Sequence, residues 1–548
     1  MRKITETENK NQRALSVILT VLLAFFLCLI FYVNLSCNPE YYDGDMYSDL
    51  NYAKEAWKAK SLFPSSWIFG NQTYAFSTPV LAALLYGMTS NVILSMAAAS
   101  CIMTVLIVLS YDWMMKPLYS YNERIGSFLI MAGFVIGRKH IAASPKGAQL
   151  LFTMASYYAG YLITAFVIYG CYIRVRNGYP KKKTIPMALL SVALSFASGT
   201  QSLRQTAVTV LPLVACEGLL TLAQLIKSKG IKNPKTLIFS VAILISNIAG
   251  LITVKLIKPN QHQIFGETSL NLSFENICQK AVEGIRAISR LFRVERMPSP
   301  AQIVFMAFFV ILILSAVITC AVRSFKRKEK ELSDFSLLFV VFLGVASIFL
   351  VGLITNIQVR EIYYFMLFPL IAVGSAYILK IRAKLRKPVY ACLAVVFSFV
   401  IAYNFAVTSK EIKAGRSTES SAHVAARYAL DNGYEHIYAS FSCASNIAIA
   451  SGDKLDLVFF GNNSGTLSLE PVKYLCVKDY YKLCDNSESL YYFTKDDREK
   501  ANELAEKLGV KPEIATEFGD GSCFMRMPQN VCILAQRESE KNSVSNQD

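Results

Sequence analysis

Long apolar runs, each about as long as a helix that crosses a bilayer, constrain this chain more than any other feature of its sequence. A hydrocarbon core about 30 Å thick requires about 20 consecutive apolar residues in a helix, and lipid admits no other spanning structure except a closed barrel. Hydrophobic residues make up 53% of the 548 residues, a share that favours a polytopic α-helical membrane protein. We predict about eleven spans, near residues 14–35, 91–115, 124–141, 150–173, 184–203, 206–226, 236–257, 301–322, 334–355, 361–380 and 388–407.

The basic residues lie mainly in the short segments between these runs, and they gather in alternate loops. Cytoplasmic loops carry the excess of Lys and Arg in membrane proteins, so this pattern predicts an N-terminus inside and a C-terminus outside. The predicted extracytoplasmic segments are 36–75, a loop at 138–149, a long loop at 258–300 and everything after Thr408. The formal net charge of +17 is thereby explained by membrane topology, and we predict no nucleic-acid partner.

Three other segments lack the composition of a span. Residues 77–88 form an apolar run too short to cross the membrane comfortably, and we predict a helix that lies in the interface or re-enters it. Residues 408–536 alternate strand-like runs such as EHIYAS and LDLVFF with helical patterns, which predicts a small extracytoplasmic α/β domain. Residues 537–548 are predicted to form a disordered tail, and residues 1–407 the transmembrane domain.

The densest acidic cluster follows the first predicted span, in the stretch YYDGDMYSDLNYAKEAW that runs from Tyr41 to Trp57. Its second part has the pattern of an amphipathic helix with Asp45 as N-cap, and this structural role explains Asp45 and Asp49 as well as a catalytic one does. Asp43 stands before the helix, beside two tyrosines. Because a carboxylate in a partly desolvated cleft binds a proton more tightly and can act as a general base, Asp43 is the first catalytic candidate.

The run DGDMYSD, from Asp43 to Asp49, resembles the acidic element of the first extracytoplasmic loop in the GT-C superfamily of integral-membrane glycosyltransferases. The resemblance is to the polyprenyl-phosphate-sugar-dependent, protein O-mannosyltransferase-like group, whose element reads Asp-Glu-x-x-Tyr-x-Glu. It implies that Asp43 is the catalytic aspartate, and that Tyr47 and Asp49 are accessory or acceptor-binding residues. Gly44 stands where the family often has Glu, which keeps both Asp43 and Asp45 as candidates for the base.

Two later segments extend the resemblance. SGTQSLRQTAVTVLPLV is similar to a family loop that often bears a Lys before a Leu/Pro-rich helix, and Arg204 stands in for that Lys. NIQVREIYYFMLFPLIAV resembles the Arg-x-x-Tyr-x-x-Pro start of a late helix, which implies donor-phosphate roles for Arg360 and Tyr363. Arginine suits a lipid phosphate because its planar guanidinium binds phosphate oxygens and stays charged near lipid. The alternative for each arginine is an anchor that extends to the membrane surface.

Further candidates lie in the other predicted extracytoplasmic loops. His140, in GRKHIAASPKGAQ, is a candidate accessory acid–base group, although a lone His is more often only a solvated surface residue. Arg286, Arg290 and Arg293 recur at helical spacing and predict a surface helix that contacts membrane lipid headgroups. Neighbouring carboxylates are compatible with a divalent metal such as Mg²⁺ or Mn²⁺, but we find no third and fourth ligand in the sequence and predict no metal site.

The resemblance implies an inverting transfer of a sugar from a polyprenyl-phosphate donor to an acceptor hydroxyl. The acceptor would be an envelope glycan, lipid or protein on the outer face of a bacterial cytoplasmic membrane. Two alternatives are a transporter or flippase of lipid-linked glycans and a non-catalytic cell-envelope assembly protein. Transporters place polar groups near the bilayer midplane, whereas the informative residues here gather on one predicted face, which favours the enzyme. The sequence contains no P-loop and no GxGxxG motif, so an ATP-driven pump is not expected.

Overall fold

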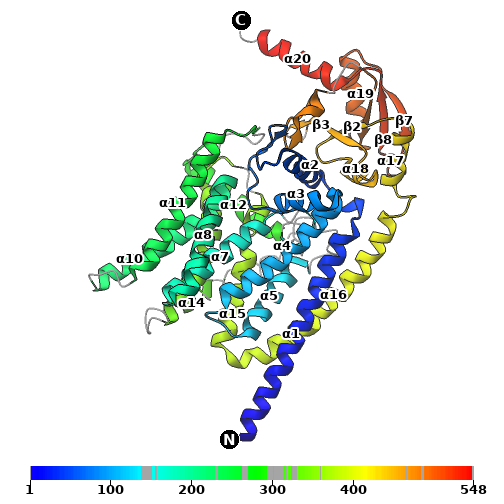
Figure 1. The fold of residues 1–548 in the computed structure, drawn as a ribbon. Helices are drawn as coiled ribbons and strands as arrows, with labels where there is room; N and C mark the ends of the chain where they lie inside the picture. The colour runs from blue at the N-terminus through cyan, green and yellow to red at the C-terminus, as the bar shows by residue number, and fades with distance from the viewer. Residues whose placement is uncertain are drawn as a thin grey trace.

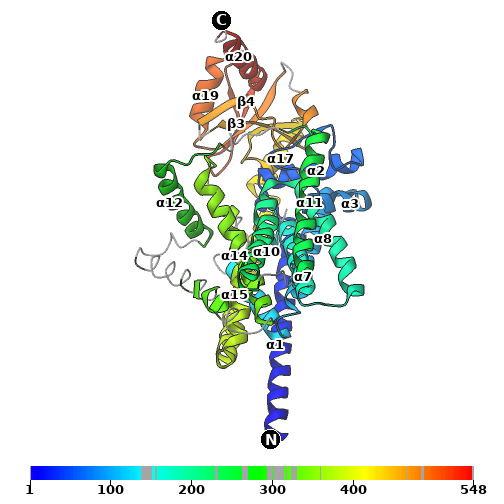
Figure 2. The same cartoon turned by 90° about the vertical axis from the view of Figure 1, so that its left-hand side faces the viewer.

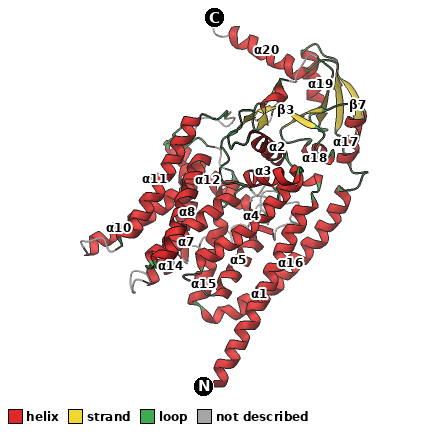
Figure 3. Cartoon of the chain, viewed as in Figure 1, coloured by secondary structure: helices red, strands yellow, loops and turns green. Residues whose placement is uncertain are grey.

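The long helices of the chain form one bundle, and a small sheet covers one end of it (Figure 1, Figure 3). The N-terminus lies at the opposite end of the bundle from the sheet. The computed structural model describes residues 2–136, 151–154, 157–228, 233–261, 269–292, 300, 311, 314–315, 317–322, 330–357, 360–463, 466–482 and 487–545. The predicted loop 138–149 therefore lies outside the described residues, as does most of the predicted span 301–322.

The bundle is built from helices that follow the predicted apolar runs. They are α1 (Arg2–Ser36), α4 (Val92–Met115), α5 (Tyr121–Ile136), α7 (Ala159–Arg176), α8 (Lys181–Gln201), α10 (Leu211–Ser228), α11 (Pro234–Ile257), α14 (Lys330–Ile354), α15 (Leu367–Ile381) and α16 (Arg386–Gly415).

Seven helices in the described part of the chain are long and apolar enough to cross a membrane, which is the make-up of a multi-pass membrane protein. They are Gln12–Ser36, Val92–Met115, Leu203–Ile226, Pro234–Ile257, Leu332–Ile354, Glu361–Ile381 and Arg386–Gly415. Three other predicted spans coincide with α5, α7 and α8, which do not reach that length and hydropathy. Almost every residue of α7 is buried, so it needs no lipid-facing stripe. Helix α8 begins with three lysines and contains Pro186, which lower its apolar content.

Two short helices lie across the end of the bundle, between the long helices and the sheet (Figure 1, Figure 2). They are α2 (Gly44–Ala59), in the acidic stretch, and α3 (Thr78–Thr89), which confirms a helix in the short apolar run. A third helix at this end is α12 (Phe274–Leu291), whose sequence is strongly amphipathic and contains two of the three arginines with helical spacing.

Helix α2 begins earlier than the sequence pattern suggests. Asp43 is its N-cap and accepts a hydrogen bond from the Met46 amide at 3.0 Å, so the prediction of Asp45 as N-cap was wrong. Aspartate is a favoured N-cap residue, so the local sequence allows either Asp43 or Asp45 at this position. The close packing of Gly44 on the sheet domain accompanies the start of the helix at Gly44. Gly44 packs so closely on the sheet domain that a Cβ there would lie 1.8 Å from the Phe441 carbonyl oxygen.

The C-terminal sheet has six strands in the order β4-β3-β2-β6-β8-β7. Strand β2 pairs in parallel with both β3 and β6, and the outer pairs are antiparallel. The strands are β2 (His436–Ser440), β3 (Asp456–Asn463), β4 (Thr466–Pro471), β6 (Ser489–Phe493), β7 (Glu513–Glu517) and β8 (Cys523–Met527). Its helices are α17 (Ser421–Asp431), α18 (Ser445–Ala450), α19 (Arg498–Lys507) and α20 (Val531–Ser545). Helix α20 occupies part of the segment predicted to be disordered, because Val531 and Cys532 are fully buried and anchor its first turn.

The first loop and the sheet domain are joined by several direct contacts. Strand β1 (Trp67–Ile68) pairs with β5 (Cys476–Val477) to form a two-stranded sheet. The Tyr47 hydroxyl accepts a hydrogen bond from the Leu457 amide at 3.0 Å, and Lys54 forms an ion pair with Asp453 at 2.9 Å. The sheet domain is therefore held against α2, directly beside the acidic cluster.

Candidate active site

Three carboxylates converge at the N-terminus of α2. Asp43 caps the helix, and Asp45 and Asp49 are four residues apart, so they share one helical face. The negative charge of Asp43 helps to raise the pKa of Asp45, and both of these acids help to raise the pKa of Asp49. The three side chains thus act on one another electrostatically across a small region.

The three carboxylates differ in burial. Asp49 is only 2% exposed and accepts a hydrogen bond from the Tyr74 hydroxyl at 2.7 Å, and burial raises its pKa well above the usual range. Asp43 is half-buried, and burial raises its pKa against the opposing hydrogen bonds from the Met46 amide and the Tyr157 hydroxyl. The Tyr157 hydroxyl lies 3.3 Å from Asp43 Oδ1.

Asp45 is the carboxylate that solvent or a ligand can reach. Its side chain is exposed, yet the protein around it removes enough hydration to raise its pKa to about 6. Loss of hydration is the main cause and repulsion by Asp43 adds to it, while attraction by Arg360 opposes both. A carboxylate with a pKa near neutrality has the properties of a general base.

Arg204 lies at the junction of two helical segments. It belongs to the short helix α9 (Leu203–Gln205), whose N-cap Ser202 accepts the Arg204 amide through its hydroxyl. A π-helical turn, η3 (Thr206–Val210), follows directly, and such turns often occur at functional sites. The Arg204 guanidinium donates to the Tyr158 hydroxyl at 2.7 Å and lies 4.2 Å from the centre of the Tyr363 ring.

Tyr363 connects this arginine to the second one. It lies in the short helix η5 (Glu361–Tyr364), which begins immediately after Arg360. Phe365, the residue after η5, stacks on Tyr158 with the ring centres 4.4 Å apart. The two segments that carry Arg204 and Arg360 are thus packed together through aromatic rings, and Arg360 acts electrostatically on both Asp45 and Tyr158.

Tyr157 and Tyr158 link the acidic and the basic sides of the site. These consecutive residues contact Asp43 and Arg204 respectively, so one short piece of backbone sets the spacing between the two groups. Neither tyrosine is among the residues that sequence reasoning selects. The tyrosine pair directly before an apolar run is the signal that could have found them, because aromatic residues gather at membrane surfaces.

Tyr474 brings the sheet domain to the same place. Burial raises its pKa to about 12, and Asp45 adds to this shift while Arg204 and Arg360 oppose it. The ring lies against Gly70 of the first loop, where a Cβ would lie 2.6 Å from a Tyr474 ring carbon. A glycine at position 70 therefore permits the close contact.

The structure thus brings together six of the residues that the sequence singles out: Asp43, Asp45, Asp49, Arg204, Arg360 and Tyr363. Tyr47 is 1% exposed and bonds to the sheet domain. His140 lies outside the described residues. In the described ranges, no group of three or more His, Cys, Asp or Glu side chains is arranged to hold a metal ion.

No protein-family model matches the sequence, and no curated protein matches it. Two similar solved structures are crystal structures of ArnT from Cupriavidus metallidurans, one in the apo state and one bound to undecaprenyl phosphate. In each comparison the TM-score is 0.49 and the sequence identity is 12%. The matched region covers 94% of the present chain and 98% of the ArnT chain.

Proposed function

We propose that this protein is a membrane glycosyltransferase that moves a sugar from a polyprenyl-phosphate donor to an acceptor hydroxyl on the extracytoplasmic face of the cytoplasmic membrane. One observation carries the proposal. Carboxylates from α2 and arginines from two distant segments meet at one end of a bundle of membrane-length helices. Such a site can accept a proton and stabilise a departing phosphate at the same time.

Asp45 is the proposed proton acceptor. It takes the proton of the acceptor hydroxyl as that oxygen forms a bond to the anomeric carbon from the face opposite the phosphate. A pKa of about 6 keeps Asp45 ionised at neutral pH and leaves it basic enough to hold the transferred proton. Asp43 is the proposed positioning residue, since its carboxylate already accepts hydrogen bonds from the Met46 amide and the Tyr157 hydroxyl.

Arg204 and Arg360 are the proposed phosphate-binding residues. As the bond from the anomeric carbon to the phosphate oxygen breaks, negative charge accumulates on the departing lipid phosphate. Guanidinium groups offer several donors in a fixed plane, and a preorganised cation stabilises this charge without further rearrangement. Tyr158 and Tyr363 hold the Arg204 guanidinium in place from an edge and a face. The presence of carboxylates and arginines at one site supports both the proposed inversion of configuration and the proposed use of this donor.

The decisive experiment measures release of free polyprenyl phosphate from a radiolabelled polyprenyl-phosphate hexose. Purified protein in detergent is supplied with a membrane-glycan extract as acceptor. Asp45→Asn should lower turnover by about 10²- to 10⁴-fold and keep donor binding, because general-base catalysis contributes roughly that factor. Asp43→Asn should keep the helix, since Asn caps as well as Asp, and should lower turnover less. Asp431→Asn, a change on the exposed end of α17, is the matched control.

Each outcome assigns a role. Loss of turnover in Asp43→Asn but not in Asp45→Asn would make Asp43 the base. Wild-type protein that binds the lipid but releases no phosphate, with several sugars and acceptors, would overturn the enzyme in favour of a transporter or an assembly protein. The position of the charged groups at one end of the bundle speaks against transport, because transporters bind their substrates near the bilayer midplane.

A further inference from the structure

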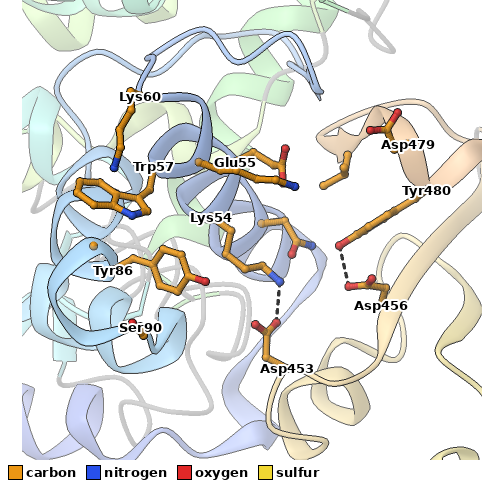
Figure 4. Close-up of a pocket in the computed structure, with 14 residues that line it drawn as sticks. Lys54, Glu55, Trp57, Lys60, Tyr86, Ser90, Asp453, Asp456, Asp479 and Tyr480 are labelled. Carbon is orange, nitrogen blue, oxygen red and sulfur yellow. Dashed lines mark hydrogen bonds and ion pairs between the residues drawn. The ribbon is translucent and has the colours of Figure 1, made fainter.

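A separate cleft lies between α2, the end of α3 and the sheet domain (Figure 4). Its volume is about 780 Å³, within the roughly 300–1,000 Å³ range of small-ligand sites. The lining side chains are mainly polar, charged or aromatic. They include Asn51, Lys54 and Glu55 of α2, Tyr86 of α3, and Asp453 and Tyr480 of the sheet domain.

The cleft is on the side of α2 that faces away from the candidate active site. Lys54 follows Asp45 by nine residues and projects from the opposite face of the helix, at about 100° per residue, whereas Glu55 projects from the flank, about 80° from Asp45. Helix geometry puts the two sites about 15–20 Å apart, measured along and across α2. The cleft and the carboxylates are therefore distinct sites that share one helix.

The charged groups of the cleft are held by their neighbours. Lys54 forms an ion pair with Asp453 at 2.9 Å, and the Tyr480 hydroxyl donates to Asp456 at 2.7 Å (Figure 4). Lys60 lies over the Trp57 ring, 2.8 Å from its centre. Groups fixed in this way lose little freedom when a ligand binds, so the cleft is preorganised.

One buried polar atom beside the cleft has no hydrogen-bond partner in the described part of the chain. Asn51 lines the cleft and is 3% exposed, and its Oδ1 has no hydrogen-bond partner among the residues that the structure describes. Buried polar atoms are nearly always hydrogen-bonded in folded proteins. This oxygen has almost no accessible surface, so the side chains that a ligand in the cleft can contact are the charged and aromatic ones.

The chemistry of the lining selects the ligand class. In the described part of the chain, the carboxylates here do not group as metal ligands. The three lysines already contact a carboxylate or an aromatic ring: Lys54 on Asp453, Lys58 on Glu55 and Lys60 on Trp57. Anions are therefore poorly matched. Hydroxyl groups both donate to carboxylates and accept from ammonium groups, and aromatic side chains contact apolar C–H faces.

We infer that this cleft is a saccharide-binding site that holds part of the acceptor chain while another part of the chain reaches Asp45. This inference rests on the proposed function, and it adds that the acceptor is an oligosaccharide or carries one. A single sugar cannot span the distance between the two sites, whereas a chain of several residues can.

Binding is tested without catalysis, on full-length protein in lipid nanodiscs and without donor. Saturation-transfer NMR and calorimetry use three probes: maltotriose, N,N′,N″-triacetylchitotriose and the glucosamine trimer. At least one should bind, and Asp453→Asn and Tyr480→Phe should each raise its Kd at least tenfold. Matched controls on the sheet domain, Asp431→Asn and Tyr434→Phe, should leave the Kd unchanged. Thermal unfolding of each variant verifies that it is folded.

Each result supports or overturns the assignment. Binding of none of the three saccharides, or binding that is insensitive to both cleft variants, overturns it. Displacement of a bound saccharide by phosphocholine at equal concentration reassigns the cleft to a lipid headgroup. The failures are separable: saccharide binding without turnover refutes the proposed transferase, and turnover without saccharide binding in the cleft refutes only this inference.

Discussion

Tyr47 provides a sharp test of how the first loop and the sheet domain depend on each other. The resemblance in the sequence assigns it an accessory or acceptor-binding role, whereas the structure places its hydroxyl 3.0 Å from the Leu457 amide. Both residues are 1% exposed, and the Tyr47 ring also meets Phe459 edge-on. Tyr47→Phe removes only the hydroxyl group and retains the packing, so it removes this hydrogen bond together with the side-chain hydrogen bond between Tyr47 and Asn51.

The expected cost follows from what the substitution leaves behind. The Leu457 N–H loses its acceptor in a place that water does not reach, and a buried unsatisfied donor costs about 1–3 kcal/mol. If that free energy is lost when the sheet domain opens away from α2, the opening equilibrium increases about 5- to 150-fold. Turnover per folded molecule should stay close to that of wild type, because Tyr47 and Asp45 point to different sides of α2.

Hydrogen exchange followed by mass spectrometry measures this opening directly, in peptides that contain Leu457. Tyr52→Phe is the matched control: Tyr52 is also in α2 and fully buried, but its hydroxyl donates to the Leu62 carbonyl within the first loop. Exchange at Leu457 should accelerate in Tyr47→Phe and not in Tyr52→Phe. Unchanged exchange at Leu457, combined with lost turnover in Tyr47→Phe, would refute the docking role and restore a role in acceptor binding.

Three other predictions concern the active site. Turnover should fall as pH decreases through about 6 with a one-proton slope, because Asp45 must be ionised, and a flat profile from pH 5 to 8 contradicts this assignment. Arg204→Lys should weaken binding of polyprenyl phosphate by about 10- to 150-fold, since Lys keeps the charge but cannot both bond Tyr158 and present a planar donor set; equal binding would refute it. Burial raises the pKa of Asp49 in the folded state, so as pH rises from about 4 to that folded-state pKa the carboxyl ionises in the unfolded state but stays protonated in the folded state. The stability of the wild-type protein therefore falls over this interval. Asp49→Asn, which stays neutral and can still accept from Tyr74, should remove that loss, and thermal unfolding at neutral pH should show a variant at least as stable as wild type.

The features that the sequence predicts well are those set by local physics. Hydropathy and length predict helices such as α4 and α11, because a bilayer tests only those two quantities. Strand-like and helical patterns also predict β3, whose apolar run from Leu457 to Phe460 is buried on both faces, and α19, where Ala501 and Ala505 are buried one turn apart.

The features that the sequence does not predict depend on contacts between distant segments. The start of α2 is one example, because its N-cap depends on how closely Gly44 approaches Phe441. The Tyr157–Tyr158 pair is another, since these residues acquire a role only when Asp43 and Arg204 lie on either side of them. Tyr474 comes from the last quarter of the chain, and no local pattern marks it as a neighbour of Asp45.

The pairing between the first loop and the sheet domain also affects when this part of the protein can fold during synthesis. Tyr47 and its partner Leu457 are 410 residues apart in the chain, and the paired strands β1 and β5 are separated by a similar length of sequence. At about 5–20 residues per second, the ribosome needs roughly 20–80 s to make the second partner after the first. During that interval the acidic loop has left the ribosome, but the part of the sheet domain that packs against it has not yet been made. The order of synthesis thus delays assembly of the candidate active site until nearly the whole protein has been made, and a chain that stops before β3 lacks the surface that holds α2.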